Sequence, residues 1–143
     1  MTEIASKLRK LRLIQLVLIA AIPILGYIAE MGRPHGLDNW TARHWLVAAV
    51  ALWGGWVGLR YRHRMTRRSL NAFAKDASDP KALRQWEVAN LVALTMAEGV
   101  AYWGLVVRMV LKGSLWQASL FYAAGLFLLF LWTPRLPITP ASD

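Results

Sequence analysis

One acidic residue, Glu98, lies in the middle of a long apolar stretch between Val88 and Val107. A carboxylate at the centre of a membrane-spanning helix costs about 2.5–3.5 kcal/mol on insertion-derived scales unless it is paired or neutralised. Because removal from water disfavours the charged form of a carboxyl group, an unpaired Glu98 is expected to carry a proton at neutral pH. Such a group can release and retake that proton where water reaches it.

Two neighbours of Glu98 can share a hydrogen bond with it. Tyr102 lies one helical turn after Glu98 and Thr95 lies three positions before it, and residues at these spacings are adjacent on a helix surface. We therefore predict an ion-binding group of Glu98, Tyr102 and Thr95. The alternative is structural, a protonated Glu98 that bonds a neighbouring helix and only ties the bundle together.

Other groups that could do chemistry are missing or scattered. The chain has no cysteine, which excludes disulfides, thiolate metal ligands and thiol nucleophiles. Its histidines, His35, His44 and His63, fall on different sides of the expected membrane, and no nucleophile, zinc or phosphate-binding motif is present. We predict no catalytic residue, no metal site and no cofactor, so an enzyme is disfavoured.

Four apolar blocks account for most of the 57% of hydrophobic residues in this 143-residue chain. Each block is close to the ~20 residues that a helix needs to cross ~30 Å of hydrocarbon. We therefore expect an all-α membrane protein, a four-transmembrane-helix bundle that forms a single domain over residues 1–143. The predicted spans are about 11–29, 42–59, 88–110 and 115–132, with a basic loop over 60–85.

Capping residues mark the expected helix ends. Gly113 is expected to end the third helix, which makes the third and fourth helices antiparallel neighbours. The expected N-terminal caps are Thr41 for the second helix, Ser78 or Asp79 before Pro80 for the third, and Ser114 with Gln117 as a capping box for the fourth.

The basic residues, which give a net charge of +9, lie mostly before the first block and between the second and third blocks. Basic segments stay on the cytoplasmic side, so both termini are predicted to be cytoplasmic. After Arg68, an apolar stripe indicates either a short helix on the inner leaflet or a continuation of the second helix. Five arginines are expected to face anionic lipid headgroups, although topology alone explains them: Arg60, Arg62, Arg64, Arg67 and Arg68.

Small residues at four-residue spacing predict the helix-packing faces, because they let helices approach closely in lipid. Packing within the monomer is favoured over a dedicated dimer face. The predicted packing residues are Gly54 and Gly58 in the second span, and Ala93, Ala97, Ala101 and Gly104 in the third. Of the eight tryptophans, Trp40, Trp45, Trp86, Trp116 and Trp132 are expected near the interfaces, and Trp53, Trp56 and Trp103 deeper.

Two further acids lie near the ends of the expected spans. Glu30 and Arg108 fall at a similar depth. They could form an ion pair, or each side chain could extend separately to the lipid headgroups. Glu87 lies on nearly the same helical face as Glu98, three turns away. A solvated Glu87 beside Arg84 is favoured over a proton path to Glu98.

The segment Ala97–Val107 resembles the carboxylate helix of the proteolipid subunit c of rotary ATP synthases. In that family a glutamate is followed six residues later by Gly-Leu-Val, with an aromatic residue before the glycine. Glu98, Trp103 and Gly104 have this spacing, and the resemblance implies that Glu98 is the ion-binding carboxylate. The whole chain resembles uncharacterised small four-span bacterial membrane proteins, whose Trp-x-Pro-Arg-x-Pro tail corresponds to residues 132–137. This second resemblance implies a bacterial inner membrane and no particular activity.

The sequence therefore predicts a non-enzymatic integral membrane protein in which Glu98 binds or translocates protons, alone or within a larger complex. The alternative is an accessory or scaffold subunit in which Glu98 ties helices together. Expected partners are the lipid bilayer, anionic headgroups and other membrane subunits. Nucleic acid is not expected, because the basic residues flank the apolar blocks.

Overall fold

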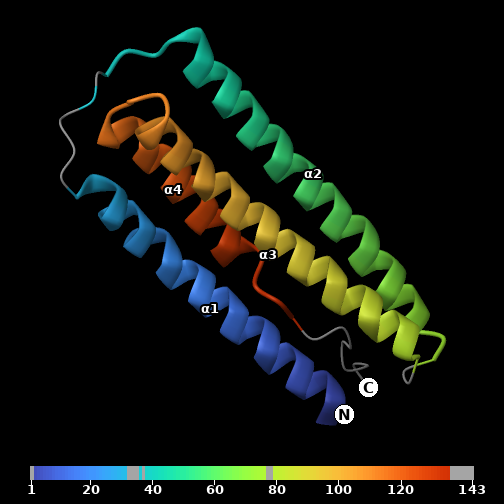
Figure 1. The fold of residues 1–143 in the computed structure, drawn as a ribbon. Helices are drawn as coiled ribbons and strands as arrows, with labels where there is room; N and C mark the ends of the chain where they lie inside the picture. The colour runs from blue at the N-terminus through green and yellow to red at the C-terminus, as the bar shows by residue number, and fades with distance from the viewer. Residues whose placement is uncertain (1, 32–35, 37, 77–78, 136–143) are drawn as a thin grey trace.

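The computed structural model describes residues 2–31, 36, 38–76 and 79–135, and these residues form one bundle of four α-helices (Figure 1). The helices are α1 (Thr2–Glu30), α2 (Ala42–Phe73), α3 (Pro80–Met109) and α4 (Leu115–Leu131). α1 and α3 run in one direction, and α2 and α4 run in the other. The prediction of an all-α four-helix bundle is confirmed.

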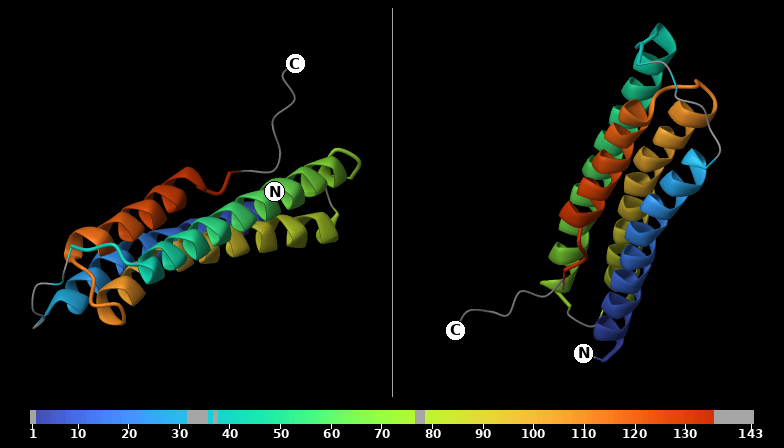
Figure 2. Two further views of the ribbon diagram at one scale, coloured as in Figure 1. Left: turned by 90° about the horizontal axis from the view of Figure 1, so that it is seen from above. Right: turned by 90° about the vertical axis from the view of Figure 1, so that its left-hand side faces the viewer.

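α3 is the central helix of the bundle. It packs against α1, α2 and α4, while α4 also packs against α1 (Figure 2). Its buried face carries small side chains, and Ala93, Ala97 and Ala101 are at most 2% exposed. A face of this kind lets three neighbours approach one helix closely.

Glycines complete the close contacts around α3. A Cβ atom on Gly58 would lie 2.8 Å from Cβ of Met96, and one on Gly104 would lie 2.8 Å from the carbonyl oxygen of Ala118. Gly54 departs from the predicted packing, because nothing lies within 4 Å of its Cβ position. Gly54 therefore faces away from the bundle.

The connection between α2 and α3 is much shorter than the predicted basic loop over 60–85. α2 continues without a break to Phe73, and α3 already begins at Pro80. A second small core explains this extension, because Phe73 packs with Leu8 of α1 and with Leu83 and Trp86 of α3. Of the two interpretations of the stripe after Arg68, the structure has the continuation of the second helix.

Three predicted N-terminal caps are confirmed. Thr41 and His44 form a capping box on α2, the Asp79 carboxylate accepts from the backbone N–H of Lys81 at 2.8 Å, and Ser114 forms a capping box with Gln117. The predicted end of the third helix at Gly113 is wrong, because α3 ends at Met109. Lys112, not Gly113, takes the left-handed conformation, with φ of 53°.

Gly113 is needed in the α3–α4 turn because of crowding. A Cβ atom there would lie 2.6 Å from Oε1 of Gln117 and 2.8 Å from Cγ1 of Val107. The amide of Gly113 also donates to the carbonyl of Val107 at 3.0 Å. The turn therefore stays tight without using the conformational freedom of its glycine.

Among the described residues, two helices are long and apolar enough to cross a membrane, α1 from Glu3 and the whole of α3. Their most apolar windows have mean hydropathies of 2.1 and 1.4. α4 is apolar but only 17 residues long, and the apolar part of α2 includes Arg43 and His44. Of the most apolar 18-residue stretch in each helix, only 17% is buried in the bundle for α1, against 44% for α3.

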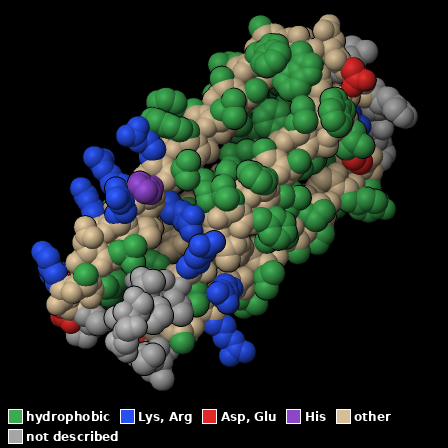
Figure 3. Space-filling model, turned by 180° about the vertical axis from the view of Figure 1, so that it is seen from behind, with side chains coloured by type: hydrophobic (Ala, Val, Ile, Leu, Met, Phe, Trp, Pro, Cys, Tyr) green, Lys and Arg blue, Asp and Glu red, His purple; other side chains and the backbone are tan. Residues whose placement is uncertain are grey.

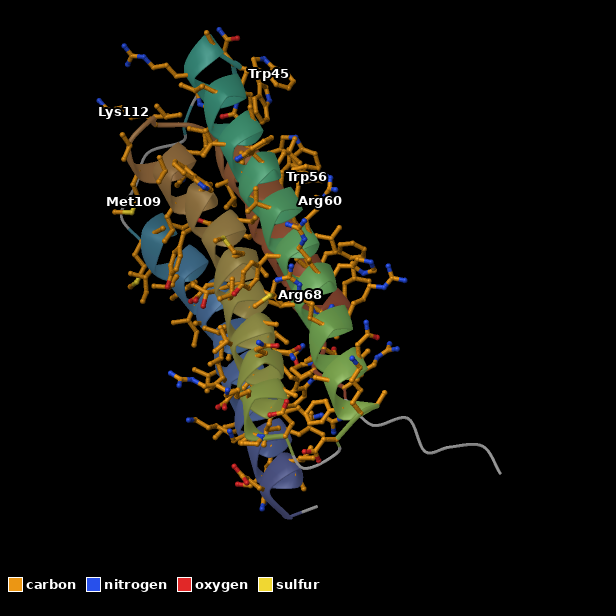
Figure 4. All side chains as sticks on the ribbon, turned by 90° about the vertical axis from the view of Figure 1, so that its right-hand side faces the viewer. Trp45, Trp56, Arg60, Arg68, Met109 and Lys112 are labelled. Carbon is orange, nitrogen blue, oxygen red and sulfur yellow. The ribbon has the colours of Figure 1, made fainter. Side chains whose placement is uncertain are left out.

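The tryptophans are arranged differently from the prediction. Trp86 and Trp132, expected at the interfaces, are 2% and 1% exposed, whereas Trp53 and Trp56, expected to pack, are 66% and 48% exposed. Trp86 belongs to the small core that α1, α2 and α3 form around Phe73, and Trp132 packs at the end of α4 against Gly58. The outward side of α2 instead carries Trp45, Trp56 and Arg60 along its length (Figure 4).

Candidate functional site

Glu98 lies on the side of α3, half-buried, and bonds a residue of its own helix. The Tyr102 hydroxyl donates to Oε1 of Glu98 at 2.9 Å, and Tyr102 is 43% exposed. Thr95 is also exposed, but its hydroxyl donates to the carbonyl of Leu91 at 3.0 Å. The structure therefore brings together Glu98 and Tyr102 but not Thr95.

The surface around Glu98 is open. Nothing lies within 4 Å of the Cβ position of the adjacent Gly99. Among the described residues, Glu98 has a hydrogen bond with Tyr102 and none with α1, α2 or α4. This arrangement leaves one carboxylate oxygen available to a group from outside the bundle.

Two ion pairs join α1 to α3, one toward each end of these parallel helices. Nζ of Lys7 lies 3.0 Å from Oε2 of Glu87. Toward the other end, Arg108 binds Glu30 through both carboxylate oxygens, with Nε–Oε1 at 2.5 Å and Nη2–Oε2 at 2.7 Å. The polarity reverses, since α1 supplies the cation at one end and the anion at the other.

The ion pairs decide whether Glu30 binds Arg108 and what Glu87 contacts, both of which the sequence left undecided. The Glu30–Arg108 pair forms. Arg108 is only 5% exposed, and it also donates to the carbonyl of Gly113 at 2.9 Å. Glu87 is not solvated beside Arg84 as favoured, because Lys7 of α1 reaches it. A sequence pattern within one helix could not reveal a partner that depends on how α1 and α3 are aligned.

The same pairs give the position of Glu98 along the bundle. Glu87 and Arg108 are 21 residues apart in α3, which corresponds to about 32 Å at the rise of an α-helix. Glu98 lies 11 residues from the first and 10 from the second. It therefore lies almost midway along the apolar part of α3.

The C-terminal end of α4 is held by polar side chains from two helices, α1 and α2. Nε2 of Gln15, which is 5% exposed, donates to the carbonyl of Leu129 at 2.5 Å and to the Thr133 hydroxyl at 3.2 Å. Nη2 of Arg62 donates to the Thr133 carbonyl at 3.3 Å. These contacts supply partners for carbonyls that a helix C-terminus leaves open.

Of the five arginines predicted to face headgroups, Arg60, Arg64, Arg67 and Arg68 are exposed on α2. Arg62 differs, because it is half-buried and turns toward the end of α4. Lysine and arginine side chains gather over one half of the molecule, and a hydrophobic surface covers much of the other (Figure 3). The basic half is the one in which α1 begins and α2 ends.

A cleft of about 410 Å³ opens at the other end of the bundle, where α1 ends and α4 begins. Glu30, Asp38, Arg108, Ser114 and Trp116 are among its lining residues. Its most buried charge, Arg108, is already bonded to Glu30. Over the described part of the chain, no three histidine or acidic side chains lie close enough to hold a metal ion.

The fold and the site define an all-α four-helix bundle with two long apolar helices and an acidic residue on the side of its central helix. Comparison with protein-family models, curated proteins and solved structures finds no match to this chain. The resemblances noted in the sequence therefore stay predictions.

Proposed function

We propose that the chain is an integral membrane protein of four spans that binds a proton at Glu98, about midway across the bilayer. Both termini lie in the cytoplasm in this proposal, and the bacterial inner membrane is the expected location. The apolar surface supports embedding in lipid, because α1 keeps most of its apolar window outside the bundle. Soluble monomers rarely expose apolar patches larger than a few hundred Å².

The single observation that carries the proton-binding proposal is the hydrogen bond between Tyr102 and Glu98 on an open side of α3. A charged carboxylate facing hydrocarbon is costly, whereas a protonated one can be tolerated when a hydroxyl group bonds it. Tyr102 can donate to either form of Glu98, because both the carboxylate and the neutral acid have an acceptor oxygen. The pair can therefore hold a proton and give it up without refolding the helix.

Transfer of the proton needs a polar surface opposite Glu98. Water does not reach the hydrocarbon core along lipid, so a partner protein that covers this side of α3 would have to supply the route. A partner of that kind would make the chain one subunit of a larger membrane complex. In the alternative, an accessory or scaffold subunit, Glu98 would only tie helices together and would never lose its proton.

Hydrophobic carbodiimides, which react with protonated carboxyl groups in apolar surroundings, test Glu98 directly. We expect native membranes that contain the chain to show labelling at Glu98, mapped by mass spectrometry of peptides. Glu98→Gln should remove the label. Tyr102→Phe should increase it at the same pH, because the variant lacks a donor that stabilises the charged carboxylate.

Glu87→Gln is the matched control, because it makes the same change in an acid of the same helix that is already paired with Lys7. We expect this variant to keep full labelling at Glu98. An unlabelled Glu98 at acid pH in a correctly inserted chain would contradict the proposal. Labelling that does not change with pH would instead favour the scaffold alternative.

A further inference from the structure

Arg62 is a half-buried cation with few partners among the described residues. Its Nη2 donates to the Thr133 carbonyl at 3.3 Å, while its Nε is buried without a hydrogen-bond partner. A guanidinium group has five N–H donors and stays charged in proteins. Burying such a group without acceptors is unfavourable, so Arg62 is suited to an additional anionic partner.

A second cation lies beside Arg62. Arg135 follows Thr133 by two residues and is exposed. Burial, together with the positive charge of Arg135, lowers the pKa of Arg62 from its usual value. The ion pairs formed among the described residues join Lys7 to Glu3 and Glu87, and Arg108 to Glu30, so none of them reaches this pair. Arg62 and Arg135 are therefore near enough to repel each other, and neither forms an ion pair with a described acid.

The pair lies at the inner margin of the apolar surface. Thr133 contacts both Arg62 of α2 and Gln15 of α1, so these residues lie at the same level. On α1, Gln15 comes three residues after Arg12, beyond which no charged residue occurs before Glu30. This is the depth at which lipid phosphates of the inner leaflet meet the ends of spanning helices.

Neighbouring side chains on α2 mark the same boundary. Cζ of Arg60 lies 4.9 Å from the centroid of the Trp56 ring, and both side chains project from the outward side of the helix (Figure 4). An exposed indole group beside an arginine is typical of the interface between hydrocarbon and headgroups. Arg68 lies six residues beyond Arg62, about 9 Å further from this boundary.

We propose that Arg62 and Arg135 together bind the phosphate group of an anionic phospholipid of the inner leaflet. Two guanidinium groups match the planar, bidentate recognition of phosphate oxygens. The lipid would also link α2 to the segment that follows α4, because the two arginines come from these two parts of the chain. This inference rests on the membrane location in the proposed function but is independent of Glu98.

Native mass spectrometry of the full chain in neutral detergent, titrated with phosphatidylglycerol or phosphatidylcholine, tests this site. We expect phosphatidylglycerol to bind more tightly. Arg62→Gln and Arg135→Gln should each weaken its binding about fivefold or more, as expected for loss of one charge at a membrane surface. Arg135→Gln is the safer variant, because it leaves the contact between Arg62 and Thr133 intact.

Arg68→Gln is the matched control and should change binding by less than about twofold, because Arg68 lies about one screening length away. Equal losses in all three variants would overturn the site in favour of diffuse attraction. Displacement of the lipid by millimolar inorganic phosphate would overturn the assignment to a lipid. Retention of the chain in carbonate-washed membranes, with Glu98 labelling, tests the proposed function separately.

Discussion

Glu30→Ala is expected to lower the free energy of unfolding by about 3 kcal/mol, because it removes the carboxylate that neutralises the buried guanidinium group of Arg108. Arg108 is 5% exposed, and both oxygens of Glu30 bond its guanidinium group. Arg108 also donates to the carbonyl of Gly113, an acceptor that carries no net charge. Circular dichroism during unfolding of the purified chain in detergent micelles would measure the loss.

Glu3→Ala makes the same substitution near the start of the same helix and serves as the control. The Lys7–Glu3 contact is 3.8 Å long, and Glu3 is 74% exposed. An exposed pair of this kind contributes at most about 1 kcal/mol. Equal losses in the two variants would show that the Glu30–Arg108 pair does not hold α1 against α3.

The Glu30–Arg108 pair also bears on how α1 would be held against α3 in the proposed membrane location. It lies at one end of the α1–α3 contact, and the Lys7–Glu87 pair lies near the other. Between them, α1 contributes a mainly apolar face with little burial. Apolar contact between helices adds little stability in lipid, because the lipid tails are equally apolar. The two ion pairs are therefore expected to contribute much of the free energy that holds α1 against α3.

Local features of the fold were predictable from the sequence because they depend on neighbours in the chain. The caps at Thr41, Asp79 and Ser114 bond backbone groups two or three residues away. The bond between Tyr102 and Glu98 likewise spans one helical turn. Thr95 has the right spacing too, but its hydroxyl donates to the backbone carbonyl four residues before it. Serine and threonine side chains in helices commonly form this local bond.

Features that depend on helix alignment were not predictable from one sequence. The pairing of Lys7 with Glu87 requires α1 and α3 to run parallel at one register. The burial of Trp132 and the inward turn of Arg62 both follow from where the shorter α4 ends between its neighbours. Composition and periodicity contain no information about that end point in three dimensions.

Gly125 of α4 is the clearest packing residue that the spacing patterns missed. A Cβ atom there would lie 2.6 Å from Cβ of Ala101, 2.9 Å from its backbone nitrogen and 3.0 Å from the carbonyl oxygen of Ala97. Two of these three atoms belong to the backbone of α3 and cannot move aside. The sequence drew attention to glycines of α2 and α3, whereas this contact needs the partner helix to be known.

Gly125→Ala is therefore expected to destabilise the bundle by about 2–3 kcal/mol, because α4 must move away from α3 to admit one methyl group. Gly54→Ala is the matched control, since nothing lies within 4 Å of its Cβ position. Alanine favours a helix interior over glycine by about 1 kcal/mol, so this variant should be slightly more stable than the natural chain. Thermal unfolding in the same micelles compares the two. The two substitutions should change the stability in opposite directions only if α4 lies against α3 at Ala97 and Ala101. A Gly125→Ala variant as stable as the natural chain would therefore refute this packing of the two helices.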